Sequence, residues 1–503
     1  MSPTVPNRLR LLLLILLIGT VYRALALHWS GLNLYVDEAQ YWTWAKALAW
    51  GYYSKPPVIA AIIAFTTSLF GDGELAVKSG ALMLYPLTTL LVYALAQRLY
   101  DARIAFWSAL VFFTLPGVAF SSLIISTDVA LFTSWAAASY GLLRALESNR
   151  WIWWLLVGVA SGIGLLTKYT MGIFALSAVL YVVLTPALRQ HLRSPRPYLA
   201  GIVAALIFAP NLWWNHLNGW PTFQHTADIS NLEAGPGLHF SELQEFVVGQ
   251  AAILGPILFV IFALCLGSAR RWLSDSRERY LACISLPFLA IISLQALLGR
   301  ANANWGAMAY VGGTIWVVAW LLQRDRQRLM LAAIALNVAV TVLAYHYHAL
   351  TRLAGIELTR KSDFYKRVQG WDEVGEQVRQ RLELYPDAHL LTDERDLMSE
   401  LRYYARPASD DAVMWNPDRV ITSHYHLVTH MDGRLGVDFL YVSRSNALPE
   451  SVRHRFFETV ELDPIHVTVV PGWSLDLRVY LLRRFQGYDS PLPLDQPPSP
   501  PLD

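Results

Sequence analysis

The chain has 503 residues, of which 54% are apolar and only 16% are charged, and its mean hydropathy is +0.35. An ordinary soluble protein carries about 25% charged residues, so this composition excludes a fully soluble protein and indicates a membrane protein with several spans. The formal net charge of +2 shows no strong basic excess, which argues against a nucleic-acid-binding protein.

About eleven apolar stretches approach the length of about 20 residues that a membrane-spanning helix needs. In chain order these predicted spans are 9–27, 77–97, 104–120, 128–146, 152–167, 170–186, 198–214, 247–268, 280–299, 304–322 and 329–347. The run 56–70 is apolar but only about 15 residues long, so we expect an interfacial or re-entrant helix there. Residues 1–26 contain the ingredients of a signal peptide, but their apolar stretch is long enough to remain as an anchor.

Arginines recur in every second connection between the predicted spans. They are Arg8, Arg10, Arg98, Arg103, Arg144, Arg150, Arg189, Arg193, Arg196, Arg270, Arg271, Arg277, Arg279, Arg324, Arg326 and Arg328. By the positive-inside rule these connections and the N-terminus face the cytoplasm. The opposite, outer side then receives everything after about residue 348. It also receives the loops at 28–76, 121–128, 167–169, 215–246 and 300–304.

The composition changes near residue 349, where charged residues and histidines become common. Alternating patterns predict strands and one amphipathic helix there. The strands are 389–392, 437–442, 465–470 and 475–482, and the helix is 396–404. The sequence therefore predicts a mainly α, polytopic membrane protein with a C-terminal soluble α/β domain. The membrane domain is 1–348, the α/β domain is 349–487, and the Pro-rich tail 488–503 is expected to be disordered.

Two carboxylate motifs fall on the predicted outer face. Asp37 and Glu38 follow the first span and lead into an aromatic, amphipathic segment. A carboxylate at the rim of a helix bundle is suited to accept a proton from a substrate hydroxyl. The alternative is an acidic helix N-terminus that pairs with the helix dipole. Asp128 begins the fourth predicted span, where an N-cap formed by Thr127 or by Asp128 itself is the alternative.

Three cations stand on the same face, where the positive-inside bias makes them unexpected. Lys55 precedes Pro56 and Pro57, which fix an extended turn before a new helix. Lys168 lies between two short spans, and Arg300 begins an Arg-x-Asn-x-Asn-Trp motif. Together the three cations could bind an anionic lipid headgroup. The alternative for each is an interface anchor whose charged end reaches the membrane surface.

The outer segment 211–225 is rich in aromatic and amide side chains, which suit either sugar contacts or an interfacial aromatic belt. No metal site or disulfide framework is expected, because the candidate ligands lack the required spacing or lie in apolar runs. These candidates are His216, His225, His239, Cys265 and Cys283.

The order of these motifs resembles that of the bacterial membrane glycosyltransferases of the GT-C fold. The shared order is a first span, Asp37-Glu38, an aromatic helix, Lys55-Pro56-Pro57, Gly71-x-Gly73-Glu74 with Lys78, an Arg-rich turn and Thr127-Asp128. This family includes aminoarabinose transferases, protein O-mannosyltransferases and lipopolysaccharide-core galacturonosyltransferases. The resemblance covers about residues 10–320. The segment 392–396 with Tyr403-Tyr404 is similar to the soluble end of the galacturonosyltransferase-like branch.

The resemblance implies a polyprenyl-phosphate sugar as donor, a lipid A, lipopolysaccharide-core or other envelope acceptor, and a place in the inner membrane. It implies Asp37 as the catalytic base, with Asp128 and Glu38 as the other candidate carboxylates. Lys55, Lys168 and Arg300 are then the expected contacts of the donor phosphate. Aminoarabinose transferases have Glu where this chain has Ser54, which argues against an aminoarabinose-specific role and against a metal contact there. No cofactor is expected.

Two other functions are compatible with parts of the sequence. A protein O-glycosyltransferase would use the same class of donor on a different acceptor. A lipid or sugar transporter, or a flippase, would place ionisable residues near the bilayer midplane and often contains inverted repeats. The ionisable motifs here lie at the outer interface and no internal repeat is visible, which favours the enzyme.

Overall fold

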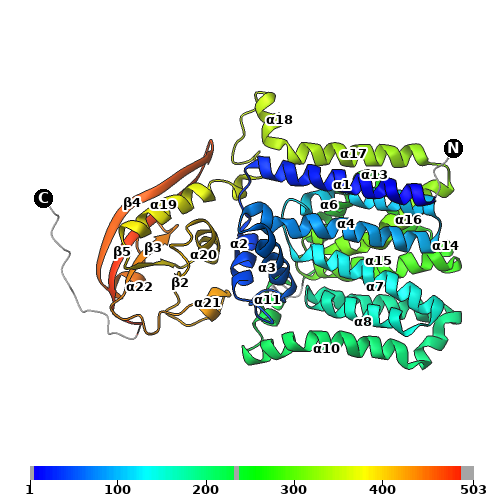
Figure 1. Ribbon diagram of the computed structural model, residues 1–503, viewed down its shortest axis with the longest axis horizontal. Coiled ribbons are helices and arrows are strands. Elements are labelled where there is room, and N and C mark those ends of the chain that lie inside the picture. Colours follow the sequence, from blue (N-terminus) through cyan, green and yellow to red (C-terminus); the bar gives the residue numbers. More distant parts are fainter. Residues whose placement is uncertain (1–4, 231–236, 489–503) are drawn as a thin grey trace. The chain divides into compact units, whose positions relative to one another are not determined.

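The computed structural model describes residues 5–230 and 237–488, which form two compact units (Figure 1). Among these described residues, the membrane unit comprises 5–30, 44–230 and 237–354, and the sheet unit comprises 31–43 and 355–488. Helix α2 (Val36–Lys46) crosses the boundary between them. The sheet unit therefore contains a segment of the first loop as well as the predicted α/β domain.

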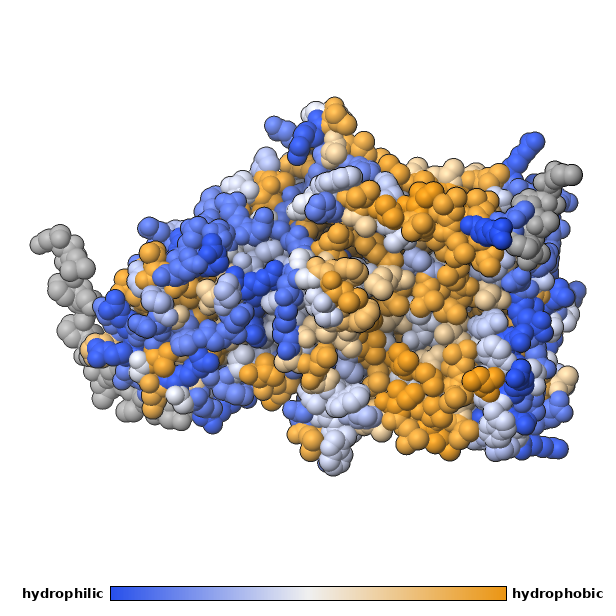
Figure 2. Space-filling model, in the orientation of Figure 1, coloured by the Kyte–Doolittle hydropathy of each residue, from blue (hydrophilic) through white to orange (hydrophobic). Residues whose placement is uncertain are grey.

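Seven helices in the described part of the membrane unit are long and apolar enough to cross a membrane. They are α1 (Val5–Ser30), α4 (Glu74–Leu99), α7 (Thr127–Ser148), α10 (Pro195–Leu217), α15 (Ser276–Leu298), η3 with α16 (Ala303–Ala309 and Tyr310–Gln323) and α17 (Gln327–Tyr345). Within its apolar window, 89% of η3–α16 is buried against 17% of α10, so α16 is central and α10 is peripheral. Figure 2 shows hydrophobic residues gathered on the visible face of the membrane unit.

The predicted count of about eleven spans is not confirmed, because several predicted spans are short or broken. A helix of 15 residues extends about 22 Å, whereas the hydrocarbon core is about 30 Å thick. In the predicted span 104–120, Pro116 starts a new helix, α6 (Pro116–Ser121). The short apolar helices are α3 (Val58–Phe70), α5 (Ala102–Phe113), α8 (Trp151–Leu165) and η1 with α9 (Tyr169–Gly172 and Ile173–Leu184). The shortness of α3 agrees with the interfacial or re-entrant helix expected there.

The predicted span 247–268 is broken in the middle. The chain bends by 115° between helices α12 (Phe240–Leu254) and α13 (Pro256–Gly267). Gly255 adopts a φ of +87°, which favours glycine, and Pro256 has no N–H for a continued helix. The pair counts as an eighth span only if both halves are taken together.

The arginine-rich helix ends gather at one end of the membrane unit. Arg98 pairs with Glu147 at 2.6 Å, which joins the C-terminal ends of α4 and α7. Arg271, in α14 (Ala269–Ser274), donates to Gln323 at the end of α16 at 2.8 Å. Since these ends follow alternate predicted spans, their contact agrees with the alternation of arginines along the chain. The remaining short helices of this unit are η2 (Pro186–Arg193), α11 (Pro221–Ser230) and α18 (Tyr347–Leu353).

The sheet unit contains a five-stranded sheet in the order β2-β1-β3-β5-β4. Strand β1 is parallel to β2 and β3, and β5 is antiparallel to β3 and β4. The predicted strands are confirmed, although the prediction 465–470 covers only part of β4. The strands are β1 (Ala388–Thr392), β2 (Val413–Met414), β3 (Asp438–Ser443), β4 (Phe456–Val470) and β5 (Trp473–Phe485).

Alternation along β1 and β3 gives the sheet two apolar faces. Leu390 and Leu440 face α19 (Trp371–Leu384) and α20 (Arg395–Tyr404), while Leu391 belongs to the opposite cluster. Both β1 and β3 end at the same edge of the sheet, and α20 begins there. The short helices η4 (Lys366–Val368), α21 (Tyr425–Val428) and α22 (Glu450–Arg453) complete this unit. Apart from Tyr488, the predicted tail 488–503 lies outside the described residues.

Candidate active site

A buried carboxylate begins α7 in the membrane unit. Asp128 Oδ1 forms an ion pair with Lys168 Nζ at 2.9 Å, and its Oδ2 accepts from Asn304 Nδ2 at 2.5 Å. The side chain of Asp128 is only 7% exposed, against 20% for Lys168. The N-cap of α7 is Ser126, so the alternative reading of Thr127 or Asp128 as the cap was wrong. Both carboxylate oxygens are therefore occupied, and the contact of Oδ1 fixes the position of Lys168.

We expect Asn304→Ala to lower the free energy of unfolding by about 1–3 kcal/mol, because one oxygen of a buried carboxylate loses its donor. Asn304→Asp should cost more, since it places a like charge beside Asp128. Thermal unfolding of the purified protein in detergent measures both. Equal stability of Asn304→Asp and the unmodified chain would contradict the contact.

Lys55 and Lys168 line one cavity of about 110 Å³. The N–H of Val58 donates to the carbonyl of Leu166 at 3.1 Å, which joins the start of α3 to the end of α8 beside Lys168. Trp305 lines the same cavity, and its ring lies 5.8 Å from Lys168 Nζ. The structure thus brings together two of the three predicted cations, although 113 positions separate them in the chain.

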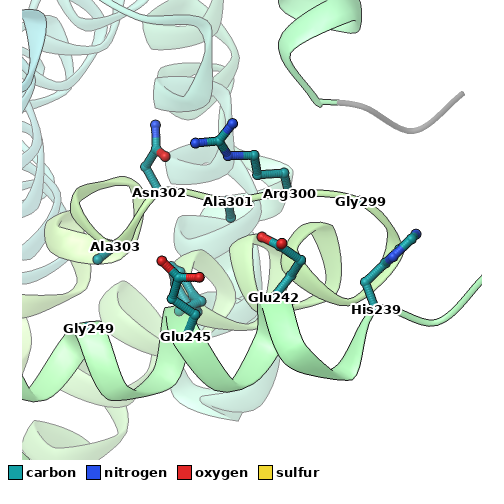
Figure 3. A pocket seen from close by; sticks show the side chains of 10 residues that line it. His239, Glu242, Glu245, Gly249, Gly299, Arg300, Ala301, Asn302 and Ala303 are labelled. Atoms are coloured by element: carbon teal, nitrogen blue, oxygen red, sulfur yellow. The ribbon is translucent and has the colours of Figure 1, made fainter. Parts of the chain in front are cut away.

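The third predicted cation lines a different and larger cavity of about 460 Å³. Figure 3 shows Glu242 and Glu245 pointing from α12 toward the loop that carries Arg300. The Arg300 side chain extends away from α12 in this view, and among the described residues it forms no ion pair with either carboxylate. The loop 299–305 borders both cavities, because Trp305 lines the lysine cavity and Arg300 lines this one.

The amides of the aromatic segment have structural partners. Asn211 Nδ2 donates to the carbonyl of Trp50 at 2.7 Å, and its Oδ1 accepts from Tyr169 at 2.9 Å. Asn215 is fully buried and its Oδ1 accepts from the N–H of Thr222 at 3.2 Å. These contacts account for both amides without a sugar. They also hold Tyr169, which lines the lysine cavity.

Two buried cations hold the segment that leads to Asp128. Arg23 donates to the carbonyl of Phe113 at 2.6 Å and to Ser122 Oγ at 3.1 Å. Lys78 donates to the carbonyl of Leu123 at 3.2 Å. These carbonyls lie at or near the C-terminal ends of α5 and α6, where helices leave acceptors unsatisfied. Arg23 lies inside an apolar span, and its local sequence does not indicate this role.

The predicted base lies in the sheet unit. Asp37 Oδ1 pairs with Arg395 Nη1 at 2.9 Å, and the same nitrogen donates to Gln40 Oε1 at 2.7 Å. Arg395 Nη2 pairs with Asp396 at 2.7 Å. Burial lowers the pKa of Arg395, but the attraction and hydrogen bonds of Asp37 and Asp396 outweigh it, so that the pKa is raised. Asp37 is therefore held beside a permanent cation.

Glu38 is fully buried and caps α2. Its Oε2 accepts from the N–H of Tyr35 at 2.8 Å. Tyr35 precedes the first residue of the helix and Glu38 is the third residue inside it, which is the reciprocal half of a capping box. This contact gives Glu38 a structural role and fixes the start of the helix that carries Asp37.

Sequence reasoning missed the partners of the two aspartates. Asn304 and Arg395 both occur in motifs that attracted attention, yet neither pattern indicates which carboxylate it meets. The spacing of three positions between Asp37 and Gln40 indicates that both lie on one face of a helix. It does not predict that both contact Arg395.

A family model and several known proteins match this chain. Residues 54–214 match the family described as dolichyl-phosphate-mannose-protein mannosyltransferase. The lipid A galacturonosyltransferase RgtD of Rhizobium johnstonii is 32% identical over 399 residues, which are 79% of this chain and 83% of that protein. An undecaprenyl phosphate-alpha-4-amino-4-deoxy-L-arabinose arabinosyl transferase of Erwinia tasmaniensis is 36% identical over 169 residues, 32% of this chain and 30% of that protein.

A solved structure has the same fold. ArnT from Cupriavidus metallidurans, in a crystal structure bound to undecaprenyl phosphate, superimposes with a TM-score of 0.60 at 14% sequence identity. The match covers 94% of this chain and 99% of that one. It therefore includes both units.

Proposed function

Since this chain belongs to the membrane glycosyltransferases of the GT-C fold, in the branch of the lipid A galacturonosyltransferases, we propose that it glycosylates the lipid A or core region of lipopolysaccharide. The donor is a polyprenyl-phosphate sugar. The observation that carries the proposal is the cavity lined by both Lys55 and Lys168. Two ammonium groups beside aromatic side chains suit a phosphate that is attached to a lipid.

The two lysines stabilise the leaving group. When the bond to the sugar breaks, the charge of the phosphate rises from one negative charge to two. Fixed cations aimed at the site where charge develops lower the barrier of such a step. Asp128 contributes by holding Lys168 in place, with Asn304 on its other oxygen. Arg300 is the third proposed phosphate contact, and it extends from the loop that also supplies Trp305 to the lysine cavity.

Asp37 is the proposed base of the transfer. Its Oδ2 takes the proton of an acceptor hydroxyl while the hydroxyl oxygen forms a bond to the anomeric carbon. The bond between that carbon and the phosphate oxygen breaks, and its electron pair leaves with the polyprenyl phosphate. Attack opposite to the leaving group inverts the anomeric configuration. Asp37 then releases its proton to water.

We propose galacturonate as the transferred sugar. The galacturonosyltransferase relative matches 79% of this chain, whereas the aminoarabinose transferase matches 32%. Ser54 precedes Lys55 where aminoarabinose transferases have Glu, which supports the same choice.

We further propose that the reaction occurs on the outer face of the inner membrane. The arginine-rich helix ends at one end of the membrane unit would face the cytoplasm. The N-terminus is then cytoplasmic and the sheet unit periplasmic.

Mass spectrometry of lipid A and core from three strains tests the function. The strains are the source organism, a deletion of this gene, and the deletion complemented with the unmodified chain. We expect a hexuronate residue to disappear from the glycolipid of the deletion strain and to return on complementation. If an aminopentose disappears instead, the proposed sugar is wrong but the proposed class of enzyme stands.

The same strains test the protein O-glycosyltransferase, and reconstituted vesicles test the transporter. If the glycolipids are unchanged and envelope proteins lose a sugar, the chain is a protein O-glycosyltransferase. In reconstituted vesicles that contain the purified chain, donor and acceptor, movement of the donor between the two leaflets without sugar transfer would contradict the glycosyltransferase proposal and favour a transporter.

A further inference from the structure

On the N-terminal side of Asp37, hydrogen bonds hold the segment 31–43 against the C-terminal part of the sheet unit. The N–H of Asn33 donates to the carbonyl of Val368 at 2.8 Å, and its Oδ1 accepts from the N–H of Trp371 at 2.9 Å. The N–H of Leu34 donates to the hydroxyl of Tyr404 at 2.6 Å. Three hydrogen bonds thus fix the backbone and one side chain within four residues of Asp37.

The same segment is fastened after Asp37 by aromatic contacts. The ring of Trp42 meets Tyr403 edge to face, with centroids 5.0 Å apart. The guanidinium of Arg406 lies 5.0 Å from the ring of Trp42 and 4.0 Å from that of Tyr403. Aromatic and cation–π pairs of this kind stabilise the contact between the elements that they join. Both ends of the stretch around Asp37 are therefore held by the C-terminal part of the sheet unit, the first end by η4, α19 and α20 and the second by α20 and Arg406.

Arg395 is itself held by three acceptors. Its Nη1 contacts Asp37 and Gln40, and its Nη2 contacts Asp396. Arg395 is the first residue of α20, at the edge where β1 and β3 end. The guanidinium is planar, so these contacts fix its orientation as well as its position.

The contact occupies only one oxygen of Asp37. Oδ1 accepts from Arg395, and no described residue forms a hydrogen bond with Oδ2. An ion pair with side chains 37% and 44% exposed contributes little to the stability of the fold, because water screens it. Stabilisation of the fold is thus a weak reason for an arginine at this place, whereas orientation of the carboxylate is a strong one.

We propose that Arg395 is a positioning residue for the transfer reaction. By binding Oδ1 it directs Oδ2 of Asp37 toward the acceptor hydroxyl. This inference rests on the proposed role of Asp37 as the base. Reacting atoms must lie within about 3–3.5 Å, and an error of about 1 Å can cost 10²-fold in rate.

Arg395→Ala, Arg395→Lys and Arg444→Ala test the proposal in the purified full-length chain. Arg444 is the matched control, because it pairs with the neighbouring Glu394 and has a similar exposed fraction, 36% against 37%. We expect Arg395→Ala to lower kcat about 10²-fold with little change in KM for the donor. Added guanidinium should restore part of the lost kcat, and Arg395→Lys should keep more activity than Arg395→Ala. Arg444→Ala should keep the unmodified kcat and show no response to guanidinium.

The outcomes separate this proposal from the proposed base. If Asp37→Asn is inactive while Arg395→Ala keeps the full kcat, the positioning role is wrong and the base stands. If Asp37→Asn remains fully active, the base itself is wrong. If Arg444→Ala shows the same fall in kcat as Arg395→Ala, Arg395 has only a structural role. The same conclusion follows if added guanidinium does not restore the kcat of Arg395→Ala. Abundance in the membrane and thermal unfolding of each variant identify those that fail to fold.

Discussion

Asp37→Asn should lower the rate of sugar transfer about 10³-fold, because the amide cannot accept the proton of the acceptor hydroxyl. The side chain keeps its size, and its carbonyl oxygen can still accept a hydrogen bond from Arg395. We therefore expect unchanged abundance in the membrane and unchanged KM for the donor. Initial rates with purified chain, lipid-linked donor and lipid A acceptor measure the effect.

Asp72→Asn is the matched control for this substitution. Asp72 lies in the same predicted outer loop and pairs with Lys46 at 2.6 Å, with both side chains more than 40% exposed. An exposed ion pair is worth about 0–1 kcal/mol, so this variant should transfer sugar at the normal rate. A well-folded Asp37→Asn variant that retains transfer would move the base to Asp128 or Glu38. The contacts of those residues make them weaker candidates.

Lys168→Met should be the second severe variant, with transfer lowered about 10²–10³-fold. The substitution removes one cation from the proposed phosphate cavity and leaves the carboxylate of Asp128 buried without its ion pair. Lys55→Met should lower transfer to a similar extent but with a smaller loss of stability, because it leaves the Asp128 pair intact. Donor KM, kcat and thermal unfolding, measured for both variants, distinguish the two effects.

Lys46→Met provides the control for both lysine variants, since it removes an exposed ammonium group from the same unit. It should bind donor and transfer sugar normally. Normal donor KM and normal kcat in Lys55→Met would show that this lysine is an interface anchor. The same result in Lys168→Met would overturn the cavity as the phosphate site.

The spans show which features of this fold follow from local sequence. Length and hydropathy predicted the seven long helices, because each is an uninterrupted apolar run. The count from the same criteria is not confirmed where a single residue pair breaks a run, as Gly255 and Pro256 do between α12 and α13. A hydropathy profile averages over about 20 residues, so it does not detect a break in the backbone that two residues such as Gly255 and Pro256 cause.

The candidate site, like the spans, could be predicted only in part from local sequence. Lys55 and Lys168 were predicted from their unexpected charge on the outer face, and they do share a cavity. Arg300 met the same criterion, yet it lines a different cavity, because charge and sidedness give no lateral position. Arg395 lies 358 positions from Asp37, and nothing in the local pattern of either residue indicates the other.

The docking of segment 31–43 also has a consequence for biosynthesis. Asn33 is separated from Trp371 by 338 positions. Ribosomes add about 5–20 residues per second, so the segment leaves the ribosome about 20–70 s before its partner does. During that interval, the stretch that carries Asp37 is without the surface that holds it. A nascent or truncated chain can therefore insert most of its helices into the bilayer before Asp37 is held by Arg395. Activity is then delayed until translation is complete.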